Sequence, residues 1–246
     1  MKLVVAGATG RTGSEVVAEA SRRGHDVEGV ARSSDDVEDV RVYPADELPA
    51  LLADADVLVD FTVPAASREH AALAAEAGVA YVVGTTGFDS GGTADLRAAS
   101  ESTAVLKASN FARGVQALLD VVAAGVEALP DYDVELTETH HSGKRDAPSG
   151  TARTVLDVVD EVRGEELDRT HGREGEHGRE ASEVGVHVRR AGTVRGEHEV
   201  LLAGNDEVLT LTHRAESRRV FAAGAVDAAE WLVGRDPGWY EFSEVL

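Results

Sequence analysis

The first 110 residues alternate between short apolar runs and segments whose apolar positions recur at helical spacing. The apolar runs consist mainly of valine, leucine and alanine, and their length is typical of buried strands. Alternating strands and helices predict a parallel sheet with helices on both faces. The predicted strands span residues 2–6, 26–31, 56–62, 79–87 and 104–110, and the predicted helices span residues 14–24, 67–78 and 93–103.

The pattern changes in the second half of the chain. A long amphipathic helix over residues 114–129 precedes several strands in which apolar and polar residues alternate, as in sheets with one buried face. Residues 165–183 are rich in charge, glycine and histidine, so we expect a surface loop there. The predicted strands span residues 132–141, 184–192, 196–204 and 206–215, and further helices are predicted at residues 150–164 and 219–234.

The predicted fold class is therefore α/β. We expect an N-terminal doubly wound parallel sheet of the Rossmann type, followed by a central α+β domain. The alternating strands of the second domain predict a mixed, mostly antiparallel sheet.

A glycine-rich loop follows the first predicted strand. The sequence GATGRTG places Gly7, Gly10 and Gly13 directly before a predicted helix. A dinucleotide-binding loop needs glycines where the backbone turns tightly and approaches the pyrophosphate, with a helix N-terminus directed at the anion. A purely structural turn is the alternative, but the order of strand, loop and helix favours dinucleotide binding.

The end of the second strand usually distinguishes NAD sites from NADP sites. An acidic residue there binds the ribose 2′-hydroxyl, whereas an arginine accepts a 2′-phosphate. This chain has Arg32, Ser33 and Ser34 at that place, and its aspartates follow later, at Asp35 and Asp36. We expect NADPH to be preferred and NADH to be possible. The alternatives are that Arg32 is an ordinary solvated arginine and that Asp35 or Asp36 reaches the ribose instead.

The net charge limits the partners of the protein. The chain has 45 acidic and 24 basic residues and a formal net charge of −21, which disfavours nucleic-acid binding. A hydrophobic content of 43% and clear periodicity favour a folded protein over a disordered one. At about 1 M salt the Debye length is only about 3 Å, so such a surface is typical of a halophilic protein, with an acidic mesophilic protein as the alternative.

Other features exclude further classes. The chain has no cysteine, so disulfides, thiolate metal sites and cysteine nucleophiles are excluded. We expect neither a membrane span nor a signal peptide, and hence a cytoplasmic protein. His171 and His177 lack tight ligand spacing, so no metal site is expected. Structural roles are expected for the histidines at positions 25, 70 and 187.

Seven motifs occur together in an order that resembles a known family. The segments VVAGATGRTG, DFTVPAA, GTTGFD, ASNFARGV, THHSGKRDAPSGTA, HVRRAGTVRGEHEV and LTHRAESRRVFAAGA closely resemble dihydrodipicolinate reductases over essentially the whole chain. The resemblance implies NAD(P)H-dependent reduction of 4-hydroxy-tetrahydrodipicolinate in lysine and diaminopimelate biosynthesis. It also implies a dinucleotide-binding domain at residues 1–111 that residues 214–246 complete, and a substrate-binding domain at residues 112–213 that forms a homotetramer.

The resemblance also implies the residues of the site. His140 matches the acid/base residue of the family and Lys144 matches its proton donor. The positions that match the pocket for the substrate carboxylates are His141, Lys144, Ser149, Gly150 and Thr151. The positions that match cofactor contacts are Gly7, Ala8, Thr9, Gly10, Arg11, Thr12, Gly84, Thr85, Thr86, Ala108, Ser109, Asn110 and Phe111, and the patterns described above add Gly13, Arg32 and Ser33.

The expected chemistry needs these residue types. A small dicarboxylate bound by a strongly acidic protein requires a local positive charge, and Lys144 is one of three lysines in the chain. The helix predicted to begin at residue 150 favours a carboxylate at its N-terminus. The proton that accompanies hydride transfer needs a general acid, which His140 or Lys144 can be, whereas an arginine at position 144 could not give up a proton.

Three other functions are compatible with a glycine-rich opening loop. Short-chain dehydrogenases need Tyr-x-x-x-Lys, which no tyrosine of this chain provides. An NADP-sensing protein would have no reason to keep the His-His-x-x-Lys motif. A related enzyme acting on another substrate, such as an amino-acid dehydrogenase, remains an alternative. Arg173 and Arg179 of the charged loop are expected to close over the site or to shape the tetramer.

Overall fold

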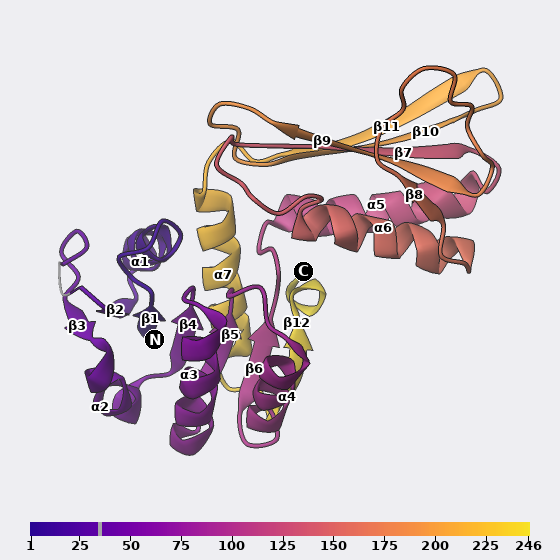
Figure 1. The fold of residues 1–246 in the computed structure, drawn as a ribbon. Helices are drawn as coiled ribbons and strands as arrows, with labels where there is room; N and C mark the ends of the chain where they lie inside the picture. Colours follow the sequence, from indigo (N-terminus) through magenta and orange to yellow (C-terminus); the bar gives the residue numbers. More distant parts are fainter. Residues whose placement is uncertain (34–35) are drawn as a thin grey trace. The chain divides into compact units, whose positions relative to one another are not determined.

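The computed structural model describes residues 1–33 and 36–246 and contains two compact units (Figure 1). The first unit comprises Met1–Ala112 together with Arg218–Leu246, and the second comprises Arg113–Ser217. Ser34 and Asp35, which belong to the segment predicted to choose between the two cofactors, lie outside the described residues.

The first unit is built around a parallel sheet with the strand order β12-β6-β5-β4-β1-β2-β3. Its strands are β1 (Lys2–Ala6), β2 (Asp26–Ala31), β3 (Val42–Pro44), β4 (Val57–Asp60), β5 (Ala80–Val83), β6 (Ala104–Lys107) and β12 (Gly238–Glu241). Its α-helices are α1 (Gly13–Arg22), α2 (Leu48–Leu51), α3 (Pro64–Ala77), α4 (Ser90–Ala99) and α7 (Arg219–Leu232), with short 3₁₀ segments at Ala45–Glu47, Leu52–Asp54 and Phe242–Val245.

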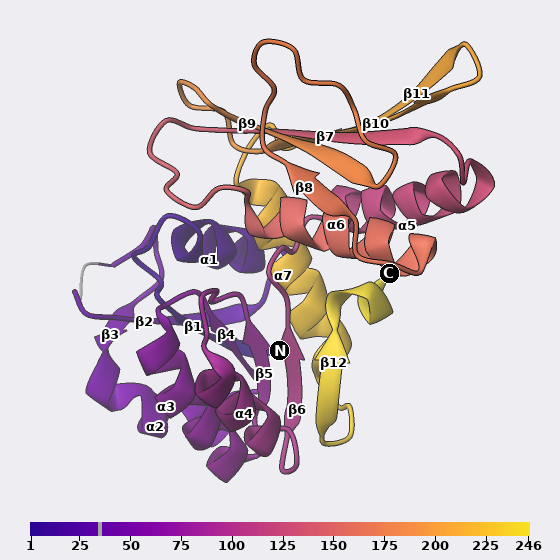
Figure 2. The same cartoon turned by 45° about the vertical axis from the view of Figure 1, so that its right-hand side comes forward.

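Both faces of this sheet are covered, as the sequence predicts. Leu3 and Val5 of β1 belong to the core that contains α1 and α7, whereas Val4 and Ala6 belong to a second core with α2, α3 and α4. Strands with two buried faces read as continuous apolar runs. The Rossmann-type doubly wound sheet is confirmed (Figure 2).

Several short elements of the first unit were not predicted. The edge strands β3 and β12 have three and four residues, and the helix α2 has four. β12 pairs with β6 in the parallel register Trp239↔Val105, although the two strands are far apart in sequence. Such short elements carry too few residues for a periodicity signal.

The second unit is a five-stranded sheet with the order β11-β10-β7-β9-β8. Its elements are α5 (Arg113–Ala128), β7 (Asp133–His140), α6 (Gly150–Arg163), β8 (Asp168–Thr170), β9 (Glu183–Arg190), β10 (Glu197–Gly204) and β11 (Glu207–Arg214). Helices α5 and α6 pack on one face of this sheet through a common core (Figure 1).

The second sheet is mixed, but it has fewer antiparallel pairs than predicted. β10 is antiparallel to β11 and β7, whereas β9 is parallel to β7 and β8. Alternating polarity indicates that a strand has one buried face, and it does not report the direction of the neighbouring strand. The expectation of a mostly antiparallel sheet is therefore wrong for two of its four pairings.

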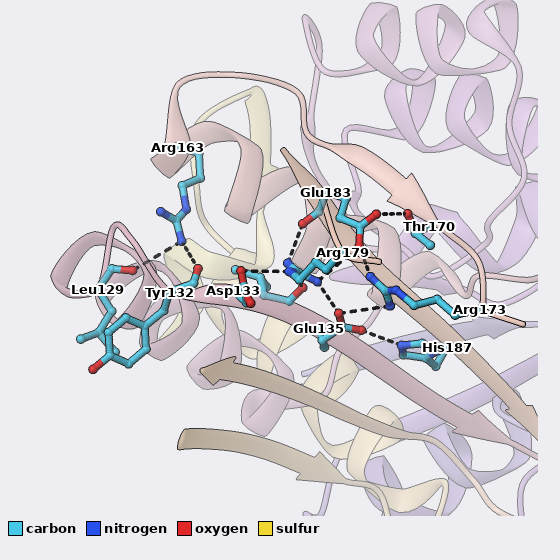
Figure 3. A network of polar contacts seen from close by, with 11 residues as sticks. Leu129, Tyr132, Asp133, Glu135, Arg163, Thr170, Arg173, Arg179, Glu183 and His187 are labelled. Carbon is cyan, nitrogen blue, oxygen red and sulfur yellow. Dashed lines mark hydrogen bonds and ion pairs between the residues drawn. The ribbon is translucent and has the colours of Figure 1, made fainter. Parts of the chain in front are cut away.

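The charged segment 165–183 is also more ordered than a surface loop. It contributes β8, and Leu167 beside β8 is buried in the core of the second unit. Figure 3 shows how the rest is held: Arg173 and Arg179 both pair with Glu135 of β7 and with Glu183 of β9. Sequence composition indicated solvent exposure, but partner carboxylates on neighbouring strands anchor this segment to the sheet.

Candidate functional site

The glycine loop of the first unit has a backbone that tolerates no side chain at two positions. Gly7 has a φ of +80°, and a Cβ there would lie 2.6 Å from the carbonyl oxygen of Phe61. A Cβ on Gly13 would lie 2.1 Å from the oxygen of Gly7. The loop leads directly into α1, whose N-terminus favours an anion. These contacts fit a loop that lets a pyrophosphate approach the backbone.

A pocket of about 610 Å³ lies beside this loop. Gly7, Thr9 and Gly10 line it together with Arg32 and Ser33 from the end of β2. The Ser33 hydroxyl lies 3.4 Å from that of Thr9. The structure thus brings the glycine loop and the residues predicted to accept a 2′-phosphate to one cavity.

The nearest described carboxylate after β2 has a structural partner. Asp36 Oδ1 accepts a hydrogen bond of 3.1 Å from the backbone N–H of Val42 at the start of β3. In this arrangement Asp36 is tied to β3, which leaves Arg32 and Ser33 as the described polar side chains from this region that line the pocket.

Other predicted cofactor residues have buried side chains. Ala8 is fully buried, and Phe111 packs between Phe61 and Phe242 with ring centroids 5.8 and 5.2 Å apart. The Thr85 hydroxyl takes part in a hydrogen-bond network inside the unit. The buried side chains of these residues therefore do not touch a nucleotide directly. The residues can contact it only through backbone atoms or influence it through their neighbours. Residues 108–110 do not line the pocket described above, and the predicted positions Arg11, Thr86 and Ser109 are exposed.

In the second unit, His140 is held by a buried carboxylate on its own strand. The Nδ1 atom of His140 lies 2.5 Å from Oε2 of Glu138, which is fully buried. Residues i and i+2 of a strand point to the same face, so β7 itself aligns the two side chains. Because ionised Glu138 can only accept, Nδ1 carries the proton and Nε2 is the atom available for other chemistry.

Arg190 of β9 supports Glu138 with two parallel hydrogen bonds of 2.8 and 2.9 Å. The backbone N–H of Ser149 donates a further bond to Glu138. Burial would raise the pKa of Glu138, but the hydrogen bonds from His140 and Arg190 outweigh it and lower the pKa to about 2. Glu138 is therefore ionised at neutral pH and fixes the orientation of the His140 ring.

The first turn of α6 lies beside this pair. Ser149 is the N-cap, and its Oγ accepts from the N–H of Ala152 at 3.2 Å. The same Oγ lies 3.0 Å from Nε2 of His198, a buried residue of β10 whose ring is 5.3 Å from that of His140. Burial, with the neighbouring His140 ring as the next cause, lowers the pKa of His198 to about 3, so His198 is neutral at pH 7. Gly150 and Thr151 form the start of the helix, as predicted.

Lys144 lies in the loop between β7 and α6. Its Nζ is 2.9 Å from Oδ1 of Asp146, and its backbone N–H donates to the carbonyl of His141. Burial would raise the pKa of Asp146, but the hydrogen bond from Lys144 outweighs it and the pKa is lowered. The loop is tied to the β9–β10 connection through Ser142 N–H and the oxygen of Gly192.

Sequence reasoning missed Glu138, Arg190 and His198. The first carried a usable signal, since a carboxylate two residues before a candidate catalytic histidine shares its strand face. The other two carried none, because Arg190 is one of many arginines and His198 one of nine histidines. Within the described residues, no group of three or more His, Asp or Glu side chains is placed to hold a metal ion.

The chain matches the profiles of one family along nearly its whole length. The profile described as dihydrodipicolinate reductase, N-terminus, matches residues 1–111, and the one described as dihydrodipicolinate reductase, C-terminus, matches residues 114–246. A 4-hydroxy-tetrahydrodipicolinate reductase of Natronomonas pharaonis is 77% identical over 246 residues, which is 100% of both chains. One of Haloarcula marismortui is 54% identical and covers 100% of this chain and 98% of its own.

Solved structures agree at the level of the fold. The dipicolinate-bound dihydrodipicolinate reductase of Paenisporosarcina sp. TG-14 superposes with a TM-score of 0.80 at 22% identity and covers 100% of this chain and 99% of its own. Aspartate semialdehyde dehydrogenase II of Vibrio cholerae reaches a TM-score of 0.60 at 15% identity, with 94% of this chain and 98% of its own covered. The architecture is thus shared with other dehydrogenases.

A Rossmann-type unit with a glycine-loop pocket, joined in one chain to a unit with an ordered histidine, defines an NAD(P)H-dependent oxidoreductase. The chain belongs to the dihydrodipicolinate reductase family. Membership excludes the short-chain dehydrogenases, and it disfavours the sensor and amino-acid dehydrogenase alternatives.

Proposed function

We propose that this protein reduces 4-hydroxy-tetrahydrodipicolinate to tetrahydrodipicolinate with a hydride from NADPH, as a step of lysine and diaminopimelate biosynthesis. The observation that carries the proposal is the cluster of His140, Glu138 and Ser149 at the N-terminus of α6. It combines an ordered acid/base group with a helix end that favours a carboxylate.

The first unit is proposed to bind the dinucleotide and the second to bind the substrate. The cofactor, when bound, supplies the hydride. The glycine loop of residues 7–13 would hold its pyrophosphate, and Arg32 with Ser33 would hold the 2′-phosphate of NADPH. NADH remains a usable second cofactor in this proposal, because only the 2′-phosphate contacts distinguish the two.

His140 and Lys144 are proposed to handle the proton that accompanies reduction. Glu138 keeps the Nδ1–H tautomer of His140, so that Nε2 is the atom that exchanges a proton. Lys144 is proposed to donate the proton and, together with His141, Ser149, Gly150 and Thr151, to hold the substrate carboxylates. The ion pair of 2.9 Å between Lys144 Nζ and Oδ1 of Asp146 holds the amino group in the loop before α6.

The assembly and the setting are proposed from the family and from the charge. We propose a homotetramer formed through the second unit, in a cytoplasm of high salt. A net charge of −21 supports the salt requirement, as do homologues from halophiles. In the described parts of the chain, no helix has the length and apolar character to cross a bilayer.

A coupled assay tests the proposed reaction. Substrate is generated freshly from pyruvate and aspartate semialdehyde by the preceding synthase, at high salt, and nicotinamide absorbance is followed with NADPH and then with NADH. Rapid oxidation that depends on both the synthase and this protein is expected. No oxidation with either cofactor, by folded protein that binds NADPH, would contradict the proposed substrate.

Replacing Arg32 by alanine tests the cofactor preference. The change should raise the KM for NADPH by about tenfold or more and leave the KM for NADH within about twofold, because only NADPH offers a 2′-phosphate to the guanidinium. Arg11→Ala, in the glycine loop, is the comparison, since a lost pyrophosphate contact would affect both cofactors alike. Equal effects of Arg32→Ala on the two KM values would contradict the assignment.

A further inference from the structure

A buried carboxylate in the first unit has no part in the proposed chemistry. Asp60 is the last residue of β4 and is fully buried. Its Oδ1 accepts from the backbone N–H of Thr62 at 2.8 Å, from the Thr62 hydroxyl at 2.6 Å and from the Thr85 hydroxyl at 3.2 Å. All three donors belong to the segments that follow β4 and β5.

The other oxygen of Asp60 faces the interior of the unit. Oδ2 lies 2.8 Å from Nδ1 of His70 on α3 and accepts from the Tyr81 hydroxyl of β5 at 2.7 Å. Tyr81 is fully buried, whereas His70 also lines the pocket of about 610 Å³. One oxygen of the carboxylate, Oδ1, thus binds the segments after β4 and β5, and the other, Oδ2, binds side chains of α3 and β5. These two sets of hydrogen bonds are called the first arm and the second arm.

The hydrogen bonds around the first arm join the segment after β4 to the segment after β5. The two joined segments are called the wall below. The Thr85 hydroxyl accepts from the N–H of Thr62 at 3.0 Å and from the Ser67 hydroxyl at 2.9 Å. Thr62 lines the same pocket, and its Cγ2 would lie 3.2 Å from a Cβ placed on Gly7. The side chain that Asp60 fixes therefore packs against the glycine loop.

We propose that Asp60 is a positioning residue for the dinucleotide, which holds Thr62 and the Thr85 segment against the glycine loop so that the pocket is formed before the nucleotide binds. The inference rests on the proposed use of this pocket for NADPH. Because the two segments are already ordered, nucleotide binding does not carry the entropy cost of ordering them. The network therefore raises the affinity for the nucleotide. Thr85, which the sequence assigned as a direct contact, acts through Asp60 and Thr62 in this view.

Paired variants of the two arms test the proposal. Thr85→Val keeps the shape of the side chain and removes the hydroxyl that ties the segment after β5 into the first arm. Tyr81→Phe removes an equally buried hydroxyl from the second arm, which donates to Asp60 and lies 3.0 Å from the carbonyl oxygen of Ser67. Asp60→Ala removes both arms. For each variant the NADPH dissociation constant is measured by fluorescence titration without substrate, the melting temperature is recorded, and kcat is taken at saturating NADPH.

Asp60→Ala should weaken NADPH binding by about tenfold or more and Thr85→Val by about three- to tenfold, because each lost bond involved a charged acceptor or its direct neighbour. Tyr81→Phe should lower the melting temperature but leave the dissociation constant within about twofold. The kcat at saturating NADPH should stay within about twofold in Tyr81→Phe, because the Tyr81 side chain is fully buried and is not among the residues that line the pocket.

Two results would overturn the proposal. Folded Thr85→Val or Asp60→Ala with unchanged NADPH affinity would remove the positioning role. Tyr81→Phe weakening binding as much as Thr85→Val would show that the network only stabilises the unit. If Asp60→Ala does not fold, the comparison of Thr85→Val with Tyr81→Phe decides. Wild-type protein that binds neither NADPH nor NADH would instead contradict the proposed function itself.

Discussion

At the scale of single residues, the ordered histidine depends on groups that are remote in sequence. Glu138 lies two residues from His140, but Arg190, which fixes Glu138 by two hydrogen bonds, is 52 residues from it. A carboxylate buried without such partners would be protonated and would then no longer enforce the Nδ1–H tautomer. The sequence motif thus predicts a functional role for His140, whereas the sheet determines which of its ring nitrogens carries the proton.

Replacing Lys144 by alanine tests the proposed proton donor. We expect kcat to fall by about 100-fold or more, because the general acid is lost, while the fold and NADPH binding are retained. Lys144→Arg is the matched control: it keeps the positive charge and should preserve substrate affinity better than alanine, but it cannot release a proton. Unchanged turnover in Lys144→Ala would contradict the role of Lys144 as proton donor. Full activity of Lys144→Arg would show that only the positive charge at this position is needed.

His198 should make the protein sensitive to acid. Its pKa is about 3 in the folded state, against an ordinary value of 6.5, so the unfolded chain binds more protons between these values. Stability from this group is therefore complete above about pH 6.5 and falls by up to about 1.4 kcal/mol per pH unit as the pH decreases toward 3.

The measurement is urea unfolding of the wild type and of His198→Gln at several pH values between 4.5 and 7.5. Glutamine offers Ser149 a polar partner but does not titrate. The variant should show a shallower loss of unfolding free energy below pH 6.5, with other acid-sensitive groups, such as Glu138, common to both proteins. Equal slopes for the two proteins would contradict the assignment.

At the scale of secondary-structure elements, the sequence predicts long periodic segments well. The helix expected at residues 150–164 is α6, which ends at Arg163 with Gly164 in the left-handed conformation at φ +75°. The helix expected at residues 67–78 begins earlier, at Pro64, because proline is well suited to the first turn. Short edge strands such as β8 exist only because a neighbouring strand offers hydrogen bonds.

The N-cap of α6 provides a prediction at this scale. Ser149→Ala should lower the free energy of unfolding by about 1 kcal/mol and raise the KM for substrate, because it removes a cap and a predicted carboxylate contact together. Asp89→Ala, which removes the N-cap that binds the N–H of Gly92 in α4, should cost similar stability without changing that KM. Thermal unfolding and steady-state kinetics separate the two effects. An equal KM for both variants would contradict a substrate role for Ser149.

At the scale of the whole molecule, the most prominent property is the large negative net charge. With a net charge of −21, long-range repulsion between carboxylates opposes folding at low ionic strength. Close ion pairs, such as those of Arg173 and Arg179 with Glu135 and Glu183, offset only part of it. Added salt weakens both, but the repulsion acts over the longer distances and is screened more strongly.

The melting temperature should therefore rise as KCl is increased from about 0.1 to about 1 M, over which the Debye length falls from about 10 to about 3 Å. Differential scanning fluorimetry measures this directly, and an uncharged osmolyte at matched osmolality is the control. A rise in the osmolyte alone would indicate solvent exclusion, and a fall in KCl would show that the ion pairs dominate.

The sequence by itself determined the alternation of strands and helices, the glycine loop, the Lys144 motif and the family, because these signals lie within short stretches of chain. Only the tertiary structure decided the direction of β9, the anchoring of the charged segment 165–183 and the partners of Glu138 and Asp60. Those features depend on which distant residues meet across a sheet, and a buried polar group acquires its ionisation and its hydrogen bonds only from the neighbours that folding brings to it.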